Sequence, residues 1–291
     1  DGVTGVQTCA LPICDPGPDM PAKMPTFYIP HGGGPCFFMD SNPRDAWDSM
    51  EAYLRGLAAT LPERPKAILV ISAHWLEDGF VVGANPKPDL IFDYYGFPPH
   101  TYELKYPAKG APDLAARIQY LLSKAGLPHG EDTTRGYDHG VFIPFLLTFP
   151  DADIPVVQLS MKADMNAALH VAAGEALAPL RDEGVLIVGS GMSFHNMAAF
   201  MGRVHIPDLK QHAVIFDEWL NEAVTQKTGA ARNDALAHWD LAPYAREAHP
   251  LQGEEHLLPL MVAAGAGGAD AGARNYHDFV MGSPISGYRF G

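Results

Sequence analysis

The stretch TFYIPHGGGPCFF, residues Thr26–Phe38, is an apolar run that ends in His31 and is followed by three glycines and a proline. Such a run is typical of a short buried strand that leads into a loop. Two chemistries use this pattern. In esterases, an HGGG loop after a strand supplies backbone N–H groups for an oxyanion hole. Alternatively, the histidine is a metal ligand at a strand end, and the glycines let a substrate approach the backbone.

Outward from this stretch, short apolar runs alternate with helical patterns. We expect strands at Thr26–Pro30, Ala67–Ala73, Ile154–Leu159 and Val185–Gly189. We expect helices at Arg44–Leu61, Pro112–Ala125, Val141–Phe149, Asn166–Asp182, Leu209–Thr228 and Glu254–Ala264. The Ala/Gly-rich stretch Ala263–Ala273 is expected to be a flexible connector. The alternation predicts a three-layer α/β/α sandwich around a mainly parallel, mixed sheet.

Composition limits the classes of function. Of the 291 residues, 47% are hydrophobic, and 34 acidic residues outweigh 20 basic ones to give a formal net charge of -14. An acidic chain without a basic stripe is a poor candidate for binding nucleic acid or an anionic membrane. No apolar run approaches the roughly 20 residues that span a bilayer. We therefore expect a globular protein that acts on a small molecule.

The N-terminal residues are set apart from the rest. Val3–Ile13 resembles a translated sequencing adapter, and a Pro/Gly-rich stretch follows it. We expect residues 1–22 to be a non-native or disordered extension and residues 23–291 to be a single catalytic domain. Cys9 and Cys14 then fall outside the domain, which leaves Cys36 alone. One thiol cannot form a disulfide framework, so we expect a cytoplasmic location.

Three histidines fall at or just beyond expected strand ends. His31 ends the first strand, His74 ends the second in AILVISAHW, and His195 closes VLIVGSGMSFHN. In an open α/β sheet, ligands bind outside the carboxyl ends of the strands. Side chains that are far apart in the sequence are therefore predicted to converge there.

Two more histidines are candidates. His256 is expected at the start of an apolar helix, where Glu254 and Glu255 precede it; we interpret Glu254 as a first-turn acid favoured by the helix dipole. His139 lies in RGYDHGVFIPF, where a polar turn opens an apolar helix. An imidazole in a pocket suits proton transfer, because its unperturbed pKa is near neutrality.

The esterase interpretation fails. It requires a G-x-S-x-G nucleophile elbow. The nearest candidates, Gly189–Ser193 and Gly282–Gly287, do not place glycines two residues before and two after one serine.

The motifs together resemble the class III extradiol ring-cleavage dioxygenases. PHGGGP, SAHW, YDHG, GSG followed by HN, and HP followed by EHLLPL occur in the family's order between about residues 25 and 290. The sequence is most similar to the single-chain 4,5-DOPA dioxygenase branch, which is related to the catalytic subunit of protocatechuate 4,5-dioxygenase. The resemblance implies an α/β sandwich, non-haem Fe(II) as the cofactor, with Zn(II) also found in relatives, and a catechol and O2 as substrates.

Carried onto this sequence, the resemblance makes His31, His74 and His256 metal ligands. His195 is then either a fourth ligand or the catalytic acid/base, and His139 lines the pocket. The common non-haem iron pattern is two histidines and one carboxylate, so Glu255 stays an alternative to His256. Many relatives have a serine after the first glycine of HGGG, where this sequence has Gly33. This difference changes the pocket wall, so the identity of the catechol is not predicted. The sequence makes no prediction of the oligomeric state.

Two other functions use the same histidines. A closed four-histidine zinc site would give a structural or binding protein without dioxygenase activity. A zinc-dependent hydrolase would be active with zinc and indifferent to oxygen.

Overall fold

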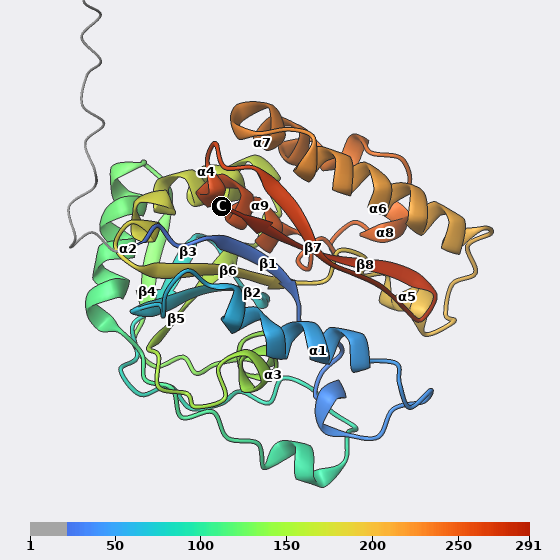
Figure 1. Cartoon of the computed structure of the whole chain (residues 1–291), viewed down its shortest axis with the longest axis horizontal. Helices are drawn as coiled ribbons and strands as arrows, with labels where there is room; N and C mark the ends of the chain where they lie inside the picture. Colours follow the sequence, from blue (N-terminus) through green and yellow to red (C-terminus); the bar gives the residue numbers. More distant parts are fainter. Residues whose placement is uncertain (1–21) are drawn as a thin grey trace, which may run out of the picture.

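The computed structural model describes residues 22–291, which form one eight-stranded sheet with helices on both sides (Figure 1). The expected extension therefore lies almost wholly outside the described residues. The strand order is β4-β3-β5-β2-β6-β1-β8-β7. The strands are β1 (Thr26–Pro30), β2 (Ala67–Glu77), β3 (Phe80–Gly83), β4 (His129–Asp132), β5 (Val156–Lys162), β6 (Val185–Gly191), β7 (Gly272–Val280) and β8 (Ser283–Phe290).

The sheet is mixed, as the sequence predicts. The central strands β5, β2, β6 and β1 are parallel to their neighbours in this group, while β8 is antiparallel to β1 and to β7. All four expected strands are present. Because the carboxyl ends of these parallel strands meet at one edge, the loops that follow them gather at the same end of the sheet.

Helices cover both faces, which completes the predicted three layers. Figure 1 shows α1 and α3 below the sheet and α4, α9 and α7 above it. The helices are α1 (Asp48–Leu57), α2 (Pro112–Lys124), α3 (His139–Thr148), α4 (Ala167–Leu177), α5 (Met197–Phe200), α6 (Leu209–Thr225), α7 (Gly229–Ala237), α8 (Ala245–Ala248) and α9 (Leu258–Gly267). Short 3-10 turns lie at Cys36–Phe38, Ala58–Thr60, Pro99–Tyr102, Ala178–Arg181 and Trp239–Leu241. All six expected helices are present, with ends displaced by a few residues.

The prediction of a flexible connector at Ala263–Ala273 is wrong. Its first half, Ala263–Gly267, is the end of helix α9, in which every residue is buried, and its last two residues begin β7. The small residues serve close helix packing. A Cβ on Gly265 would lie 2.2 Å from the carbonyl oxygen of Val171 in α4, so a larger residue there would push the two helices apart.

A second difference concerns His74. β2 does not end at Ala73 but continues to Glu77, so His74 lies inside the strand. Its pairing with β5 is irregular there, because Ile71 pairs with Leu159 whereas Leu76 already pairs with Met161. The extra residues of β2 bulge out of the ladder, and bulges of this kind redirect side chains next to functional sites.

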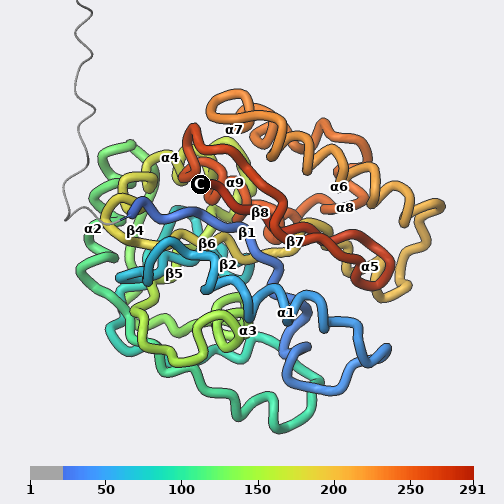
Figure 2. Tube along the Cα trace, in the orientation of Figure 1, coloured from blue at the N-terminus to red at the C-terminus, as the bar shows by residue number. Residues whose placement is uncertain are grey.

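The two ends of the described chain meet in the sheet. Figure 2 shows the blue N-terminal strand β1 beside the red strand β8, and Thr26 pairs with Phe290. The buried Arg181 holds this region together, since its guanidinium donates to the carbonyl oxygens of Met24, Ala266 and Phe290. These bonds lie at the opposite end of the sheet from His31.

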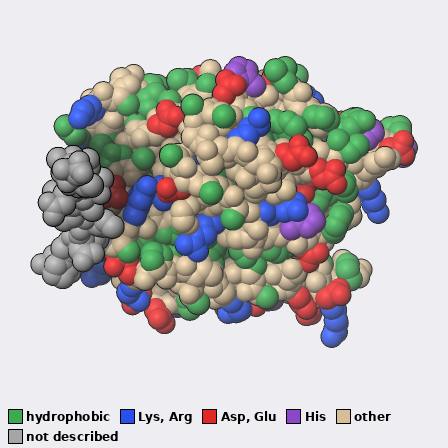
Figure 3. Space-filling view, turned by 45° about the horizontal axis from the view of Figure 1, so that its top comes forward, with side chains coloured by type: hydrophobic (Ala, Val, Ile, Leu, Met, Phe, Trp, Pro, Cys, Tyr) green, Lys and Arg blue, Asp and Glu red, His purple; other side chains and the backbone are tan. Residues whose placement is uncertain are grey.

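On the face drawn in Figure 3, acidic and basic side chains are interspersed. Within residues 22–291, no helix combines the length and the apolar character that crossing a bilayer requires.

Candidate metal centre and pocket

His31 and His74 come together at the carboxyl end of the sheet. His31 follows β1 and is 1% exposed, and its backbone N–H donates to the carbonyl oxygen of Gly191 in β6. The Nε2 atoms of His31 and His74 are 3.1 Å apart. Two nitrogens at about 2.0–2.1 Å from one shared ion are separated by about this distance.

The ring of His31 is fixed from behind. Its Nδ1 is 3.0 Å from Oγ of Ser190, and that hydroxyl donates its own proton to the carbonyl oxygen of Gly140. Ser190 Oγ therefore accepts a hydrogen bond from Nδ1–H of His31, and the lone pair of Nε2 is left free. Hydrogen bonds of this kind set the tautomer of metal-binding histidines.

His256 reaches the same place from the turn before α9. The turn crosses directly over β6: a Cβ on Gly191 would lie 2.0 Å from the carbonyl oxygen of His256, which accepts hydrogen bonds from Met192 N–H and the hydroxyl of Tyr28. The centroid of the His256 ring lies 5.2 Å from that of His31 and 4.9 Å from that of His74.

The two acids before His256 do not lie in the first turn of a helix. Helix α9 begins only at Leu258, so the expectation for Glu254 is wrong. Glu254 is buried and accepts a hydrogen bond from Arg246. Glu255 instead faces the histidines, with Oε1 3.1 Å from Nδ1 of His256 and 3.8 Å from Nδ1 of His195. Burial raises the pKa of Glu255.

His139 begins α3 and pairs with an acid that sequence reasoning missed. Asp93 Oδ1 accepts hydrogen bonds from Nδ1 of His139 at 2.8 Å and from its backbone N–H at 3.0 Å. The other oxygen of Asp93 is 3.7 Å from Nδ1 of His74. Burial alone would raise the pKa of Asp93, but the hydrogen bonds from His139 outweigh it and lower the pKa.

Asp93 belongs to a long segment, residues 84–111, that lies between β3 and α2 and contains the 3-10 turn Pro99–Tyr102 and an isolated bridge from Leu90 to Tyr137. Aromatic rings hold this segment in place. Phe92 lies edge-to-face on Phe142 of α3, with ring centroids 5.5 Å apart, and Tyr94 packs against both Tyr102 and His139. Nothing in the spacing of Asp93 from either histidine marks it as a site residue, so only the folded chain brings it into view.

His195 stacks on His256. Their ring centroids are 3.4 Å apart and their planes are inclined by 18°. The loop that carries His195 is anchored by its neighbours: His195 N–H donates to the carbonyl oxygen of Ala248, and the buried His249 bonds through Nε2 to that of Ser193.

All four imidazoles nearest the centre are neutral at pH 7. The pKa of His74 is lowered to about 3, and so is that of His195. The pKa values of His31 and His256 are also lowered well below their ordinary value. Burial is the largest cause in each case, and neighbouring imidazoles add to it. Neutral rings present lone pairs, which is the form that binds a metal ion.

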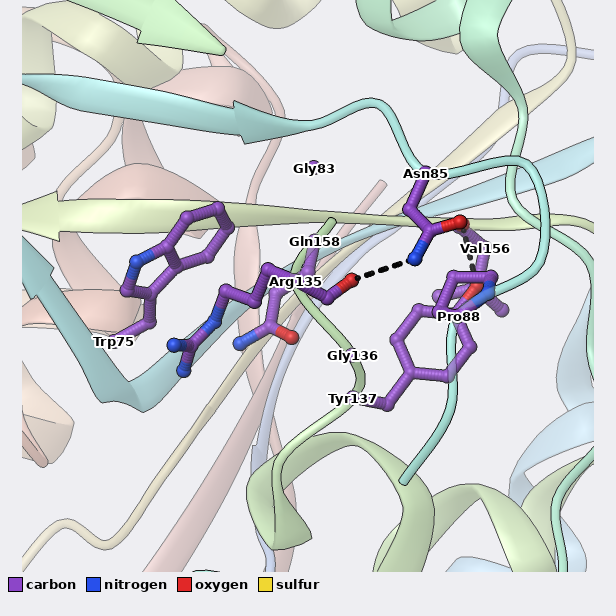
Figure 4. A pocket seen from close by; sticks show the side chains of 9 residues that line it. All are labelled: Trp75, Gly83, Asn85, Pro88, Arg135, Gly136, Tyr137, Val156 and Gln158. Carbon is purple, nitrogen blue, oxygen red and sulfur yellow. Dashed lines mark hydrogen bonds between the residues drawn. The ribbon is translucent and has the colours of Figure 1, made fainter. Parts of the chain in front are cut away.

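A buried polar network centred on Asp138 lies next to the strand bulge and to His139. Asp138 is fully buried and accepts hydrogen bonds from Ser72, Gln158 and Arg135. Burial raises the pKa of Asp138. Figure 4 shows Arg135 beside Gln158 at a cavity of about 10 Å³, with the guanidinium stacked 4.4 Å from the ring of Trp75. Arg135 also donates to the carbonyl oxygen of His74, which ties the network to the bulge.

Within the described residues, the donor atoms form two adjoining groups. Nitrogens of His31, His74 and His139 lie within 4.8 Å of one another, and so do those of His195 and His256 with an oxygen of Glu255. The predicted set His31, His74 and His256 spans both groups. Imidazoles with their Nδ1 atoms engaged and their Nε2 atoms free fit a divalent transition metal.

Comparisons with known proteins show the family of this chain. The family model described as the catalytic LigB subunit of aromatic ring-opening dioxygenase matches residues 25–291. A dioxygenase designated tasH from Hapsidospora irregularis is 39% identical over 279 residues, 92% of this chain and 85% of that protein. A 4,5-DOPA dioxygenase extradiol from Beta vulgaris is 39% identical over 269 residues, 91% of this chain and 96% of that protein.

A solved structure has the same fold. The crystal structure of an uncharacterized protein from Escherichia coli K12 superposes with a TM-score of 0.71 at 31% sequence identity, and it covers 92% of this chain and 100% of that one. Fold, histidine cluster and relatives lead to one conclusion: the chain belongs to the LigB family of aromatic ring-opening dioxygenases.

Proposed function

We propose that this enzyme opens the ring of a catechol beside its diol, with Fe(II) as the resident metal and O2 as the second substrate. The observation that carries the proposal is the convergence of three neutral imidazoles from β1, β2 and the turn before α9, with ring centroids 4.9–5.2 Å apart. The ligands we propose are His31, His74 and His256. The names of the relatives support an aromatic diol as the substrate.

In such a site, iron supplies Lewis acidity toward the two phenolic oxygens and electrons toward O2. The protein's contribution is to orient the ligands and handle protons. In our proposal Glu255 is not a ligand but accepts a hydrogen bond from Nδ1–H of His256, which leaves Nε2 of His256 for the metal.

His195 is proposed as the acid/base. Part of its side chain is exposed, and Nε2 is the nitrogen that does not face Glu255, so Nε2 is the atom that we propose takes a phenolic proton from a bound diol. His139 is proposed to line the pocket. With Nδ1 bonded to Asp93, it keeps Nε2 available to a substrate oxygen.

Reconstitution tests the proposal. The protein is loaded anaerobically with Fe(II), mixed with a catechol, and exposed to O2. We expect O2 uptake in proportion to catechol consumed and a yellow ring-fission product. A zinc-loaded sample prepared in parallel is the control and should give neither. No ring cleavage of any catechol by the iron form would refute the proposal.

One observation favours a second candidate. The stacking of His195 on His256 puts four imidazoles close together, which suits a closed zinc site without dioxygenase activity. A zinc-dependent hydrolase is a further variant of this alternative. Retention of zinc against iron, together with no O2 uptake, would support it.

Two further proposals concern the whole chain. We propose that residues 23–291 act as a single catalytic domain. We also propose a cytoplasmic location, which fits the one described cysteine, Cys36, being a free and buried thiol.

A further inference from the structure

A large groove opens beside the HGGG loop at the histidine end of the sheet. Its volume is about 660 Å³, and its walls come from the loop after β1, from Phe97, and from the tip of the β7–β8 hairpin. Figure 1 shows the blue loop and the red hairpin at the same end of the molecule. Ligand sites commonly measure about 300–1,000 Å³, so the groove is large enough for more than one aromatic ring.

Two sets of neighbouring residues link the groove to the histidine centre, although no histidine of the centre lines it. Its floor includes Gly33, which is exposed and only two residues beyond His31. Its wall includes Phe97, whose ring centroid is 5.5 Å from that of Tyr94. Tyr94 in turn lies 5.8 Å from His139. A ring bound at the histidines can therefore extend a substituent toward this groove.

The floor is open because of the residue at position 33. A Cβ on Gly33 would meet only the ring of Trp47, at an ordinary contact distance of 3.8 Å. By contrast, a Cβ on Gly34 would lie 3.1 Å from the ring of Phe97. Trp47 and Phe97 therefore lie close to the glycine backbone on either side and form two flat aromatic walls.

The lining is mostly apolar. Trp47 and Phe97 are partly exposed, and Phe279 and Met281 of the hairpin are 53% and 69% exposed. Among the described residues that line the groove, Asp40 at the rim is the one charged side chain. Lys210 lies close to Gly282 but lines the neighbouring cavity. The residues that line the groove therefore offer an anionic group a carboxylate and no cation, and Lys210 approaches them only at Gly282.

We propose that this groove binds the ring substituent of the aromatic substrate, and that the preferred substituent is apolar and carries no carboxylate. The inference rests on the proposed catechol cleavage and specifies its substrate class. It also predicts a preference against dopa, because both charged groups of its side chain would lose hydration in the groove and only the ammonium has an oppositely charged partner in the lining, Asp40.

The test is a substrate series with iron-loaded enzyme. For catechol, 4-ethylcatechol and 4-butylcatechol, we expect kcat/KM to rise by up to about fourfold for each methylene group that becomes buried. Dopa should fall well below 4-butylcatechol. Anaerobic binding of the same compounds, followed by tryptophan fluorescence, gives affinities that do not depend on turnover.

Two variants sharpen the test. Met281→Lys adds a cation at the hairpin tip, so it should lower kcat/KM for 4-butylcatechol and raise it for dopa. Trp47→Ala removes a wall and should flatten the chain-length series. The control is Tyr95→Ala: this side chain is 91% exposed and does not line the groove, and the series should be unaffected.

The outcomes separate the two proposals. Turnover of every catechol without dependence on chain length or on Met281→Lys overturns the groove assignment and leaves ring cleavage standing. Chain-length-dependent binding without ring cleavage supports the groove and refutes the proposed reaction.

Discussion

In each half of the histidine centre, one carboxylate contacts two histidines, but the two carboxylates hold their histidines with different strength. On one side, His74 and His139 share Asp93, which accepts two hydrogen bonds of 2.8 and 3.0 Å from His139. On the other side, His195 and His256 share Glu255, whose closest approach is 3.1 Å. The pKa of Asp93 is lowered and that of Glu255 is raised.

The difference shows how a carboxylate becomes a firm support. Asp93 is held charged by a backbone and a side-chain donor from one residue, so it fixes the ring of His139. The side chain of Glu255 is about as buried as that of Asp93, but it has a single close partner, so its charged form is less favoured. We infer that the Asp93 side is the more rigid half and that the Glu255 side is more easily rearranged.

The largest effect should come from removing one ligand from each half. If both halves serve one ion, His74→Ala and His256→Ala should each reduce bound metal to background and abolish activity, because three ligands are needed to hold it. Metal content per chain, measured on purified protein, decides this. Retention of one equivalent by either variant would mean that the halves bind separate ions.

The proton-handling histidines come next. His195→Ala should keep most of its Fe(II) and lose roughly 10²–10⁴-fold in turnover if it is an acid/base. His139→Ala should keep its iron and show a defect that depends on which catechol is used. Iron content is measured beside kcat for both variants. Full activity in His195→Ala would contradict the mechanism, and a parallel fall of iron and rate would make His195 a ligand.

The two carboxylates test the comparison directly. Asp93→Asn removes the charge that supports both His74 and His139, so metal affinity should fall about 10–100-fold. Glu255→Gln should cost less, since its charged form is less favoured. Competition with a metal chelator measures both. Glu218→Gln, an exposed change on α6, is the matched control. Equal losses in the two variants would remove the distinction between the halves.

The smallest effect is expected from the N-terminus. We propose that residues 1–22 contribute to neither half. Their deletion should leave the melting temperature and the metal affinity unchanged. A large fall in either quantity, measured by calorimetry and metal titration, would reverse this view.

The central strands could be predicted because their signal is local. β1, β2, β5 and β6 are continuous apolar runs, as buried parallel strands are. β4 has the sequence HGED, which carries no hydrophobic pattern, and β3 has only four residues. β7 and β8 contain polar residues, two glycines and a proline, and they pair with each other around a tight turn. Their formation depends on the neighbouring strand more than on their own sequence.

The site divides in a similar way. The five histidines stand out because each adjoins a glycine or serine motif or an apolar run, and strands bring their positions together by a general rule. Asp93 was missed because its role depends on contacts with residues 19 and 46 positions away. Glu255 could be noticed because it adjoins His256, but only its contacts separate a ligand from a partner of Nδ1.

The weak attachment of residues 84–111 affects how the enzyme loses activity in denaturant. This segment carries Asp93 but contributes no regular ladder to the sheet, and it is held by an isolated bridge between Leu90 and Tyr137 and by aromatic packing on α3. Segments with few backbone hydrogen bonds detach at lower free energy than core strands. Mild denaturant should therefore release Asp93 while the amide protons of β2 and β6 remain protected from exchange. Inactivation would then precede global unfolding, and it would be reversed when the segment docks again.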